Sequence, residues 1–366
     1  MIQKNFINSI RNKVKLINEA IAPVLHKDNF YRCTCPSCGS KATIIDGHRG
    51  LFKCLNSMCD AQGNVIDYIK MRDNLSYRKA IEKILQQHPE LKETEEYTQN
   101  IEASLNSDLK REQLLEVNRI IENYFRNQLS FSHSKNANNY LYETRKLTKK
   151  TVHDFGIGYV TSCDALINSL LLKFDKDTLL KSGMFYVKDG KLKGKFWNRI
   201  TFPITDEWNN IISFGGRVLD KSTPKYLNGP DTMLFNKRLH LFGLGQALAN
   251  SDNRWLDNII ICEGYMDVIS MHQAGFTNCV ASLGTALTVQ QCDLLKKYTD
   301  TVYLAYDYDD AGNKAANRAN EQLLKLGMTV KRINLSPYKD PDEFIKENGV
   351  NSLIKRIKNA KNIIKG

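Results

Sequence analysis

The sequence predicts an α/β fold in three parts. These are a small N-terminal β module built around cysteines, a mixed α+β segment rich in basic residues, and a parallel sheet with helices near the C-terminus. Five of the nine cysteines lie between Cys33 and Cys59, residues 181–242 carry an excess of Lys and Arg, and three short apolar runs after residue 258 each end in acidic residues. β-Branched and aromatic runs of this length, separated by helical patterns, are typical of buried parallel strands.

The overall composition limits the class of protein. The chain has 366 residues, enough for two or three domains with their own cores. Its net charge of +12 predicts a polyanionic partner, nucleic acid before a membrane. No apolar run approaches the length that spans a bilayer, and the N-terminus lacks the pattern of a signal peptide. We therefore expect a cytoplasmic protein with no membrane partner.

The clustered cysteines have the spacing of a zinc ribbon. A CxxC pair is followed, after fifteen residues, by a Cx₄C pair; the four are Cys35, Cys38, Cys54 and Cys59. A tight CxxC turn presents two thiolates to one tetrahedral ion, and a second hairpin supplies the other two. Without a secretion signal, the clustering favours metal thiolates over disulfides. The alternative is four unrelated buried thiols, with Cys33 as a surplus thiol and His48 as a substitute ligand.

Acidic residues follow each of three predicted strands, 259–262, 301–306 and 330–335. They are Glu263 and Asp267 after the first strand, Asp307 and Asp309 after the second, and Asp340 and Asp342 after the third. Ligands of open α/β sheets bind beyond the carboxyl ends of the strands, so the three clusters should converge. Converging like charges repel unless cations lie among them, and oxygen-seeking Mg²⁺ or Mn²⁺ suits that place. The alternative is that these carboxylates are ordinary helix N-caps and solvated loop residues.

Residues 181–242 form the basic segment. They hold eleven Lys or Arg against five acidic residues, interleaved with aromatic side chains such as Trp197 and Tyr226. Positive charge mixed with aromatic rings suits a groove that follows a phosphate backbone and stacks bases. The aromatic residues could equally form the core of a β-sheet.

These motifs resemble one family. Glu263-Gly-Tyr-Met-Asp267, Ser282-Leu-Gly-Thr285, Asp307-x-Asp309-x-Ala-Gly312 and Asp340-Pro-Asp342 together resemble the Toprim domain of bacterial DnaG-type primases. The cysteine stretch resembles the zinc-binding domain of the same family, and the likeness covers residues 30–85 and 135–345. Three departures are visible: Tyr308 replaces the usual glycine between the two aspartates, Cys38 takes a place often held by histidine, and the second cysteine pair is wider than CxxC.

The resemblance also implies nucleotide-binding and template-binding residues. By their positions in the family motifs, the nucleotide-binding residues are Arg145, Arg217, Lys225, Asn228 and Lys237, the last near the initiating nucleotide. Arg199 would hold the backbone of the template or of the heteroduplex. Lys146 stands where the family usually has a glycine after the arginine. The alternative for each basic residue is a solvated surface charge.

The activity that the resemblance implies is synthesis of short RNA primers on single-stranded DNA by two-metal nucleotidyl transfer. Asp307, Asp309, Asp340 and Asp342 would bind two or three Mg²⁺ or Mn²⁺ ions, and one zinc ion would hold the ribbon. Glu263 would be either a ligand or the proton acceptor, and Asp267 would support the ligands or bind a third ion. The expected partners are single-stranded DNA template, nucleoside triphosphates and the RNA–DNA primer duplex.

Two other functions are weighed against primer synthesis. A Toprim enzyme that cuts DNA would need either a large separate domain with a nucleophilic tyrosine, as in a topoisomerase, or an ATPase. No Gly-x₄-Gly-Lys-Ser/Thr motif of an ATPase occurs in the chain. A non-catalytic zinc-ribbon factor would bind single-stranded DNA and would have no need of the acidic clusters.

The expected domain order follows from these motifs. It is a zinc ribbon with flanking helices at 1–90, a linker at 91–113, the basic subdomain of the primase core at 114–250, the Toprim subdomain at 251–345 and a helical tail at 346–366. A solvated helix is the alternative for the linker. The short tail has no room for a helicase-binding domain, so we expect a separate replicative helicase and a phage or mobile-element origin.

Overall fold

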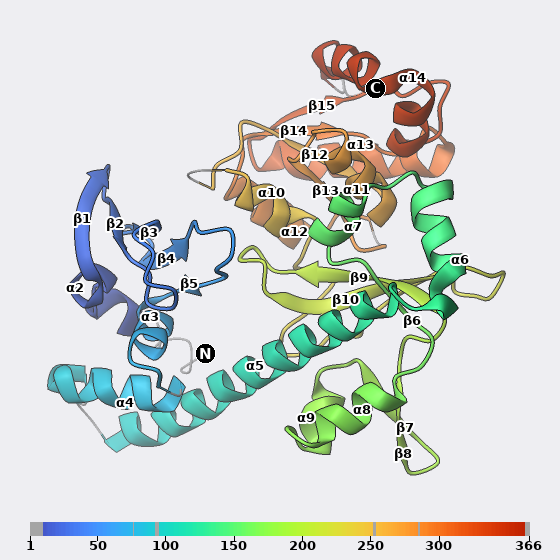
Figure 1. Cartoon of the computed structure of the whole chain (residues 1–366). Coiled ribbons are helices and arrows are strands. Elements are labelled where there is room, and N and C mark those ends of the chain that lie inside the picture. Colours follow the sequence, from blue (N-terminus) through green and yellow to red (C-terminus); the bar gives the residue numbers. More distant parts are fainter. Residues whose placement is uncertain (1–9, 76, 92–94, 252–253, 285, 363–366) are drawn as a thin grey trace. The chain divides into compact units, whose positions relative to one another are not determined.

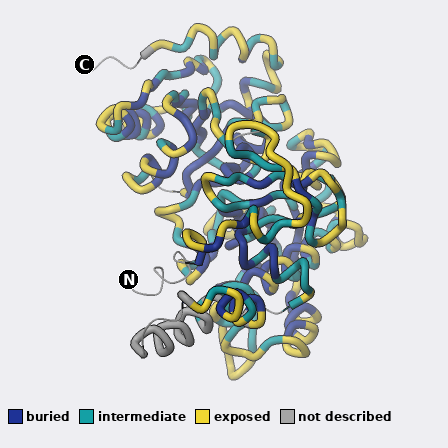
Figure 2. The backbone as a smooth tube through the Cα atoms, turned by 90° about the vertical axis from the view of Figure 1, so that its left-hand side faces the viewer, coloured by how far each residue is buried: buried dark blue, intermediate teal, exposed yellow. Residues whose placement is uncertain are grey.

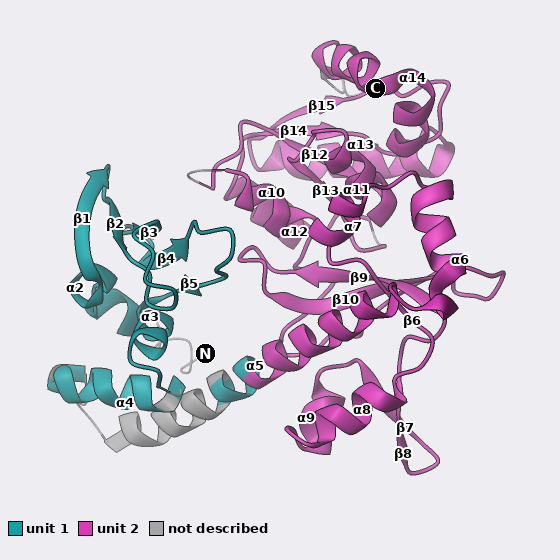
Figure 3. Ribbon diagram, viewed as in Figure 1, with its two compact units in different colours: residues 1–112 teal, residues 113–366 magenta. Residues whose placement is uncertain are grey.

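The computed structural model describes residues 10–75, 77–91, 95–251, 254–284 and 286–362 (Figure 1). The backbone divides into two compact units, residues 1–112 and residues 113–366 (Figure 3). Helix α5 (Glu95–Gln128) includes the boundary. The segment 91–113, for which a linker and a solvated helix were both expected, is therefore helical from Glu95 onward. Residues 92–94 and Thr285 of the Ser-Leu-Gly-Thr motif lie outside the described residues.

Unit 1 is built on a five-stranded antiparallel meander. The strands are β1 (Ile21–Lys27), β2 (Phe30–Thr34), β3 (Thr43–Asp46), β4 (Leu51–Cys54) and β5 (Gln62–Gly63), which pair in chain order. The helices are α2 (Leu16–Glu19), α3 (Val65–Arg72), α4 (Tyr77–Gln87) and the short 3₁₀ turn η1 (Pro89–Leu91). Alternate residues of β3 and β4, including Ile45 and Phe52, point into a core shared with α3 and α4. This packing holds the cysteine-bearing turns between the strands.

A capping box starts helix α3 directly after β5. The Asn64 side chain accepts a hydrogen bond from Ile66 N at 2.8 Å, and the Asp67 carboxylate accepts one from Asn64 N at 2.9 Å. Both bonds satisfy backbone donors that the first helical turn leaves free. The apolar face of α3 is then buried against the sheet, and the Tyr68 hydroxyl donates to Thr34 O at 2.7 Å.

The first sheet of unit 2 is antiparallel. Its order is β11 (Tyr226–Asn228), β10 (Ile211–Val218), β9 (Arg199–Thr205) and β6 (Gly158–Val160), and all seven residues of β9 are buried. A Cβ on Gly215 would lie 2.5 Å from the Tyr265 hydroxyl, so glycine lets that ring pack against β10. The aromatic residues therefore divide: Phe196 and Phe202 are core residues, whereas Trp197 is 68% exposed.

Short elements surround this sheet. They are the 3₁₀ turn η2 (Ser132–Ser134), α6 (Lys135–Asn138), the π-helical turn η3 (Asn139–Thr144), α7 (Lys149–Asp154), α8 (Asp164–Leu171), α9 (Lys176–Lys181) and the hairpin of β7 (Phe185–Lys188) and β8 (Lys191–Gly194). The turn η3 follows α6 without a break and ends at Arg145, whose amide donates to Tyr140 O at 2.9 Å.

The second sheet of unit 2 confirms the parallel sheet expected from the sequence. Its order is β13 (Cys279–Ala281), β12 (Ile259–Cys262), β14 (Thr301–Leu304), β15 (Thr329–Arg332) and β16 (Lys361–Asn362), of which the first four are parallel. The two-residue strand β16 is antiparallel to β15. The tail expected to be helical at 346–366 is helical up to Lys358 and then contributes the strand β16; residues 363–366 lie outside the described part.

Helices cover both faces of this sheet, and alternate residues of β12 show how. Ile260 and Cys262 pack in the core that contains α11 (Tyr265–Gln273) and α14 (Pro341–Lys358). Ile259 and Ile261 pack in a second core with α10 (Leu244–Ala249), α12 (Val289–Lys296) and α13 (Asp310–Lys325). Strands β12 and β13 are thus buried along their whole length, whereas β14 and β15 are partly exposed; buried and intermediate stretches of the backbone are coloured in Figure 2.

In the part of the chain that the structure describes, no helix combines the length and the apolar character needed to cross a membrane.

Candidate metal sites and nucleotide-binding site

The four predicted zinc ligands lie together in unit 1. The sulfur atoms of Cys35, Cys38, Cys54 and Cys59 all lie within 4.8 Å of one another. The Cys35–Cys59 and Cys38–Cys54 sulfur pairs are each 3.8 Å apart. Zn–S bonds of about 2.3 Å place neighbouring sulfurs of a tetrahedral site about 3.8 Å apart, so the cluster fits a zinc ion.

The pKa values of the cluster thiols differ from one another. A hydrogen bond from the Ser40 backbone lowers the pKa of Cys38 to about 7, whereas burial raises the pKa of Cys54 and raises that of Cys59 to about 12. Cys33 lies outside the cluster; it is buried, and the Tyr68 hydroxyl points to its sulfur. His48 also lies outside the cluster, because its Nε2 contacts the Asp28 carbonyl at 3.2 Å.

The three acidic clusters converge at the carboxyl ends of β12, β14 and β15. Glu263 follows β12, and its Oε1 accepts a hydrogen bond from Asp307 N, beyond β14, at 3.0 Å. Tyr308 N donates to Lys339 O at 2.8 Å, which joins the loop after β14 to the loop after β15. Because β12, β14 and β15 are parallel, these loops lie at one edge of the sheet, as the sequence predicted.

Three of the six carboxylates of this acidic edge (Glu263, Asp267, Asp307, Asp309, Asp340 and Asp342) have raised pKa values. Burial raises the pKa of Asp307 to about 6, and the charges of Glu263 and Asp340 add to the shift. Burial also raises the pKa of Glu263, with further contributions from the charges of Asp309 and Asp340. The pKa of Asp267 lies well above its usual value, because the group is buried and faces the charges of Asp340, Asp307 and Asp342. Such mutual repulsion is what a divalent cation would relieve.

Several of these carboxylates also cap helices. Asp309 accepts from Gly312 N and Asp340 from Glu343 N, each at 2.8 Å, at the starts of α13 and α14. Asp267 accepts from Gly264 N at 3.1 Å in the capping box of α11. Each cap bond occupies one carboxylate oxygen and leaves the second free for a cation. The alternative expected from the sequence, that these carboxylates are helix N-caps, is therefore correct for Asp309 and Asp340.

The acidic edge is looser than the cysteine cluster. Among the described residues, the four cysteines alone form a group of three or more Cys, His, Asp or Glu with all ligand atoms within 4.8 Å. Lys339 lies within the edge, with its Nζ 3.8 Å from Asp307 Oδ2. Sequence reasoning missed Lys339; its position inside the acidic stretch 336–342 was the available signal.

The carboxylate of Asp342 accepts hydrogen bonds from two cationic side chains of the protein itself. It is 3% exposed, and its Oδ2 accepts hydrogen bonds from Arg145 Nη1 at 2.6 Å and from Lys346 Nζ at 2.8 Å. Ser270 Oγ donates to its other oxygen. A residue predicted to bind metal and one predicted to bind nucleotide are therefore paired with each other. The 197-residue separation between them kept this pair out of reach of the sequence.

Three predicted nucleotide-binding residues form a cationic cluster, defined as Arg145, Arg217 and Lys225. The positive charge of Arg217 lowers the pKa of Lys225 most, followed by burial and by the charges of Arg145 and Lys339. Both arginines lie against Tyr140, with guanidinium carbons 5.4 Å (Arg145) and 4.6 Å (Arg217) from the ring centroid. Close cations of this kind are favourable where an anion such as phosphate binds.

The other predicted residues lie in different surroundings. Arg199 is 7% exposed, and its Nη1 donates to Gly216 O at 3.2 Å and to Pro224 O at 3.0 Å. Asn228 donates to Leu283 O and accepts from the Tyr265 hydroxyl. Lys237 is exposed on the surface. The structure thus holds Arg199 and Asn228 in internal hydrogen bonds.

Three segments of the chain each match a known protein family. Residues 2–100 match the CHC2 zinc finger, residues 124–248 match the N-terminal domain of the DNA primase catalytic core, and residues 260–345 match the Toprim-like family. The fold and the two sites thus define a Toprim protein with an N-terminal zinc ribbon.

Relatives and solved structures agree with these matches. A DNA primase of Clostridium acetobutylicum is 35% identical over 97% of this chain and 59% of its own length. A solved structure of the zinc-binding and RNA polymerase domains of Aquifex aeolicus primase is 28% identical, has a TM-score of 0.65, and covers 98% of this chain and 86% of that one. A DnaG primase catalytic domain solved bound to single-stranded DNA is 32% identical, with a TM-score of 0.63, over 69% of this chain and 80% of that one.

The chain belongs to the family of DnaG-type primases. It spans about three fifths of the length of the curated relatives that it matches.

Proposed function

We propose that the chain is a DNA-dependent RNA primase, which makes short RNA primers on single-stranded DNA. The observation that carries this proposal is the convergence of the acidic edge from three strand ends, with Lys339 acting electrostatically on both Asp307 and the cationic cluster. The DNA-bound state of one similar catalytic domain supports DNA as the template.

In the proposed reaction, the 3′-hydroxyl of one nucleotide attacks the α-phosphate of the next, and pyrophosphate leaves. Bound Mg²⁺ or Mn²⁺ ions, two or three of them, would lower the pKa of the attacking hydroxyl and neutralise the leaving group. Asp307, Asp309 and Asp340 would hold the ions with the carboxylate oxygens that their cap and loop contacts leave free. Glu263, whose pKa is raised, would either bind an ion or accept the proton.

The basic residues would bind and orient the substrates. Arg217 and Lys225 would hold the triphosphate of the incoming nucleotide, and Arg145 would join them by exchanging Asp342 for phosphate. Lys237, exposed, would lie near the initiating nucleotide. Asn228 and Arg199 would keep β10 and β11 in place for these contacts, through the hydrogen bonds already described.

The zinc ribbon would sample the template. Its cysteine cluster fits a structural zinc ion, which would hold the β-hairpins in one arrangement. Nucleoside triphosphates and the RNA–DNA duplex complete the proposed set of ligands. A separate helicase stays a prediction from the sequence.

Two alternative functions receive less support. The reported relatives are DNA primases, one matched family model is a domain of the DNA primase catalytic core, and none of the reported relatives is a topoisomerase or a nuclease. A non-catalytic factor would have no use for a half-buried set of carboxylates that raise one another's pKa. A nicking assay on supercoiled DNA with Mg²⁺ or Mn²⁺ would reveal a cutting activity directly.

Primer synthesis on single-stranded templates with four labelled nucleoside triphosphates tests the proposal. Asp307→Ala should reduce synthesis by about 10³-fold or more, the scale expected when a metal clamp is lost. The control is Asp300→Ala, because Asp300 is an exposed acid of the same subdomain that pairs with Lys296 at the surface. Synthesis by Asp307→Ala within a few-fold of the unaltered chain would contradict the proposal.

A further inference from the structure

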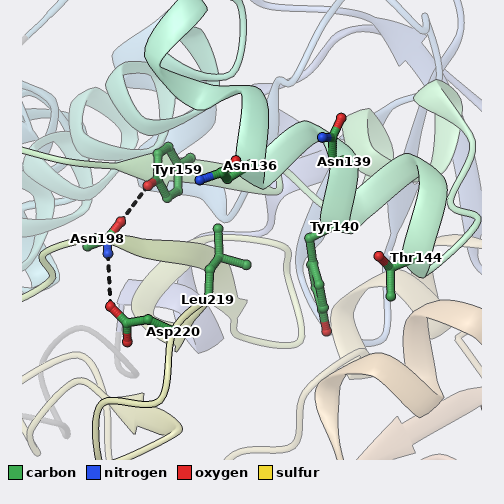
Figure 4. Close-up of a pocket in the computed structure, with 8 residues that line it drawn as sticks. All are labelled: Asn136, Asn139, Tyr140, Thr144, Tyr159, Asn198, Leu219 and Asp220. Atoms are coloured by element: carbon green, nitrogen blue, oxygen red, sulfur yellow. Dashed lines mark hydrogen bonds between the residues drawn. The ribbon is translucent and has the colours of Figure 1, made fainter.

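A cavity of about 340 Å³ opens in unit 2 between the π-helical turn and the first sheet (Figure 4). Its lining residues are Asn136, Asn139, Tyr140, Thr144, Tyr159, Asn198, Leu219 and Asp220. They come from α6, η3, β6, the loop before β9 and the loop after β10. The volume lies in the range of small-molecule binding sites. Neither the metal sites nor the predicted nucleotide-binding residues account for it.

The side chains around the cavity offer several hydrogen-bonding groups (Figure 4). The Tyr159 hydroxyl donates to Asn198 Oδ1 at 2.5 Å, and Asn198 Nδ2 donates to Asp220 Oδ2 at 3.2 Å. Asn136, which lies beside Tyr159, and Asn139, on the same turn as Tyr140, have carboxamides with no hydrogen-bond partner among the described residues. A carboxamide offers both donors and an acceptor, which matches the mixed edge of a nucleobase.

Tyr140 connects the cavity to the cationic cluster. Its ring lines the cavity, and Arg217 lies 4.6 Å from the ring centroid. Arg145 Nε donates to the Tyr140 hydroxyl at 2.7 Å. A planar group bound beside Tyr140 would therefore be one aromatic ring away from cations suited to phosphate.

We propose that this cavity binds the nucleobase of a nucleotide whose phosphates contact the cationic cluster. Tyr140 supplies a ring for stacking, the carboxamides of Asn136 and Asn139 meet the base edge, and Asp220 accepts from an N–H group of that edge, such as N3–H of uracil. The inference rests on the proposed function, since it gives the base of a substrate or template nucleotide a place. A free nucleoside triphosphate and a nucleotide of single-stranded DNA present the same chemistry.

The test compares ligands with and without a base. The double variant Asn136→Ala/Asn139→Ala removes two exposed carboxamides that the fold does not use, and Asn127→Ala is the matched control, an exposed asparagine on α5 outside the cavity. Affinity is measured on the full chain by fluorescence anisotropy, with UTP labelled at its γ-phosphate and with a labelled 12-nucleotide single strand. Inorganic tripolyphosphate serves as the base-free competitor.

We expect the double variant to weaken one of the two labelled ligands about tenfold, the scale of two lost hydrogen bonds, with tripolyphosphate competition unchanged. Loss for UTP alone assigns the base to the substrate, and loss for the strand alone assigns it to the template. Unchanged affinity for both ligands would overturn the proposal. An equal loss for tripolyphosphate would also overturn it, because the effect would then lie in phosphate binding.

A second measurement needs no variant in the cavity. Irradiation of the chain with 5-iodo-UTP, or with a strand that contains 5-iodouracil, should give adducts on Tyr140 or Tyr159, and adducts found only elsewhere would contradict the site. Asp307→Ala should keep these adducts while losing primer synthesis. Failure of the cavity proposal is thus distinguishable from failure of the proposed function.

Discussion

The cysteine cluster and the acidic edge are two candidate metal sites built in opposite ways. The four thiols come from 25 consecutive residues, 35–59, and their sulfur atoms already lie at the spacing of a tetrahedral ion. The carboxylates come from three strand ends between residues 263 and 342, and they are looser and serve as helix caps as well. In the cysteine cluster, two nearby turns set the positions of the ligand atoms. In the acidic edge, the positions of the carboxylates depend on how the strands of the sheet pack and on the repulsion between their charges.

The largest expected effect is a loss of stability when the cysteine cluster is changed. Cys54→Ala should lose zinc and unfold unit 1, because structural zinc contributes about 10 kcal/mol or more to the folding of such modules. Zinc content and thermal unfolding of the full chain measure it, with unit 2 still melting cooperatively. Cys33→Ala is the control and should retain zinc, since Cys33 lies outside the cluster. A Cys54→Ala protein that keeps one tightly bound zinc would show that the cluster is not the site.

The next effect concerns the pair of Arg145 and Asp342. Arg145→Ala should destabilise unit 2 by about 2–4 kcal/mol, because it leaves a buried carboxylate with Lys346 as its remaining cationic partner. Denaturant unfolding measures the change. Arg145→Ala/Asp342→Asn should recover much of the loss, so the double-mutant cycle should show strong coupling. Additive losses would mean that the pair does not form in solution.

Substitution of a carboxylate in the acidic edge should raise the free energy of unfolding, whereas substitution of a ligand in the cysteine cluster should lower it. Folding raises the pKa of Asp307 from its ordinary value near 4 to about 6, so this residue adds stability below pH 4 that is lost as pH rises to 6 and above. Without added Mg²⁺, Asp307→Asn should therefore raise the free energy of unfolding at pH 8, by up to about 3 kcal/mol. Thermal unfolding between pH 4 and 8 measures it, with Asp300→Asn as the control. If Asp307→Asn instead lowered stability as much as Cys54→Ala does, the expected difference between the two sites would be wrong.

The smallest effect separates two roles for Arg199. The guanidinium is buried against backbone carbonyls, so Arg199→Lys should cost about 1–2 kcal/mol of stability and leave the salt dependence of DNA binding unchanged. Anisotropy titrations of single-stranded DNA at several salt concentrations measure the slope. A slope reduced by about one would instead support the template contact that the sequence predicted.

Much of both metal sites could be predicted because their signals are local. Cysteine spacing determines how two turns face one ion, and apolar runs that end in acids determine which ends of the strands carry charge. The same reasoning did not identify Lys339, because its place beside Asp307 depends on the contact between its own loop and the loop after β14. It also assigned Arg145 and Asp342 to separate ligands, because nothing in the chain links residues so far apart.

The sequence by itself determined the order of domains to expect, the ligands of the zinc ribbon and the presence of an acidic edge, since periodicity, spacing and turn chemistry act over a few residues. Only the tertiary structure decided which charges meet: Arg145 with Asp342, Arg199 with the carbonyls of β10 and its loop, and Tyr140 between the cationic cluster and the cavity. Hydrogen bonds and ion pairs form within about 3 Å, and contacts at that range between distant segments depend on how the sheets and helices pack.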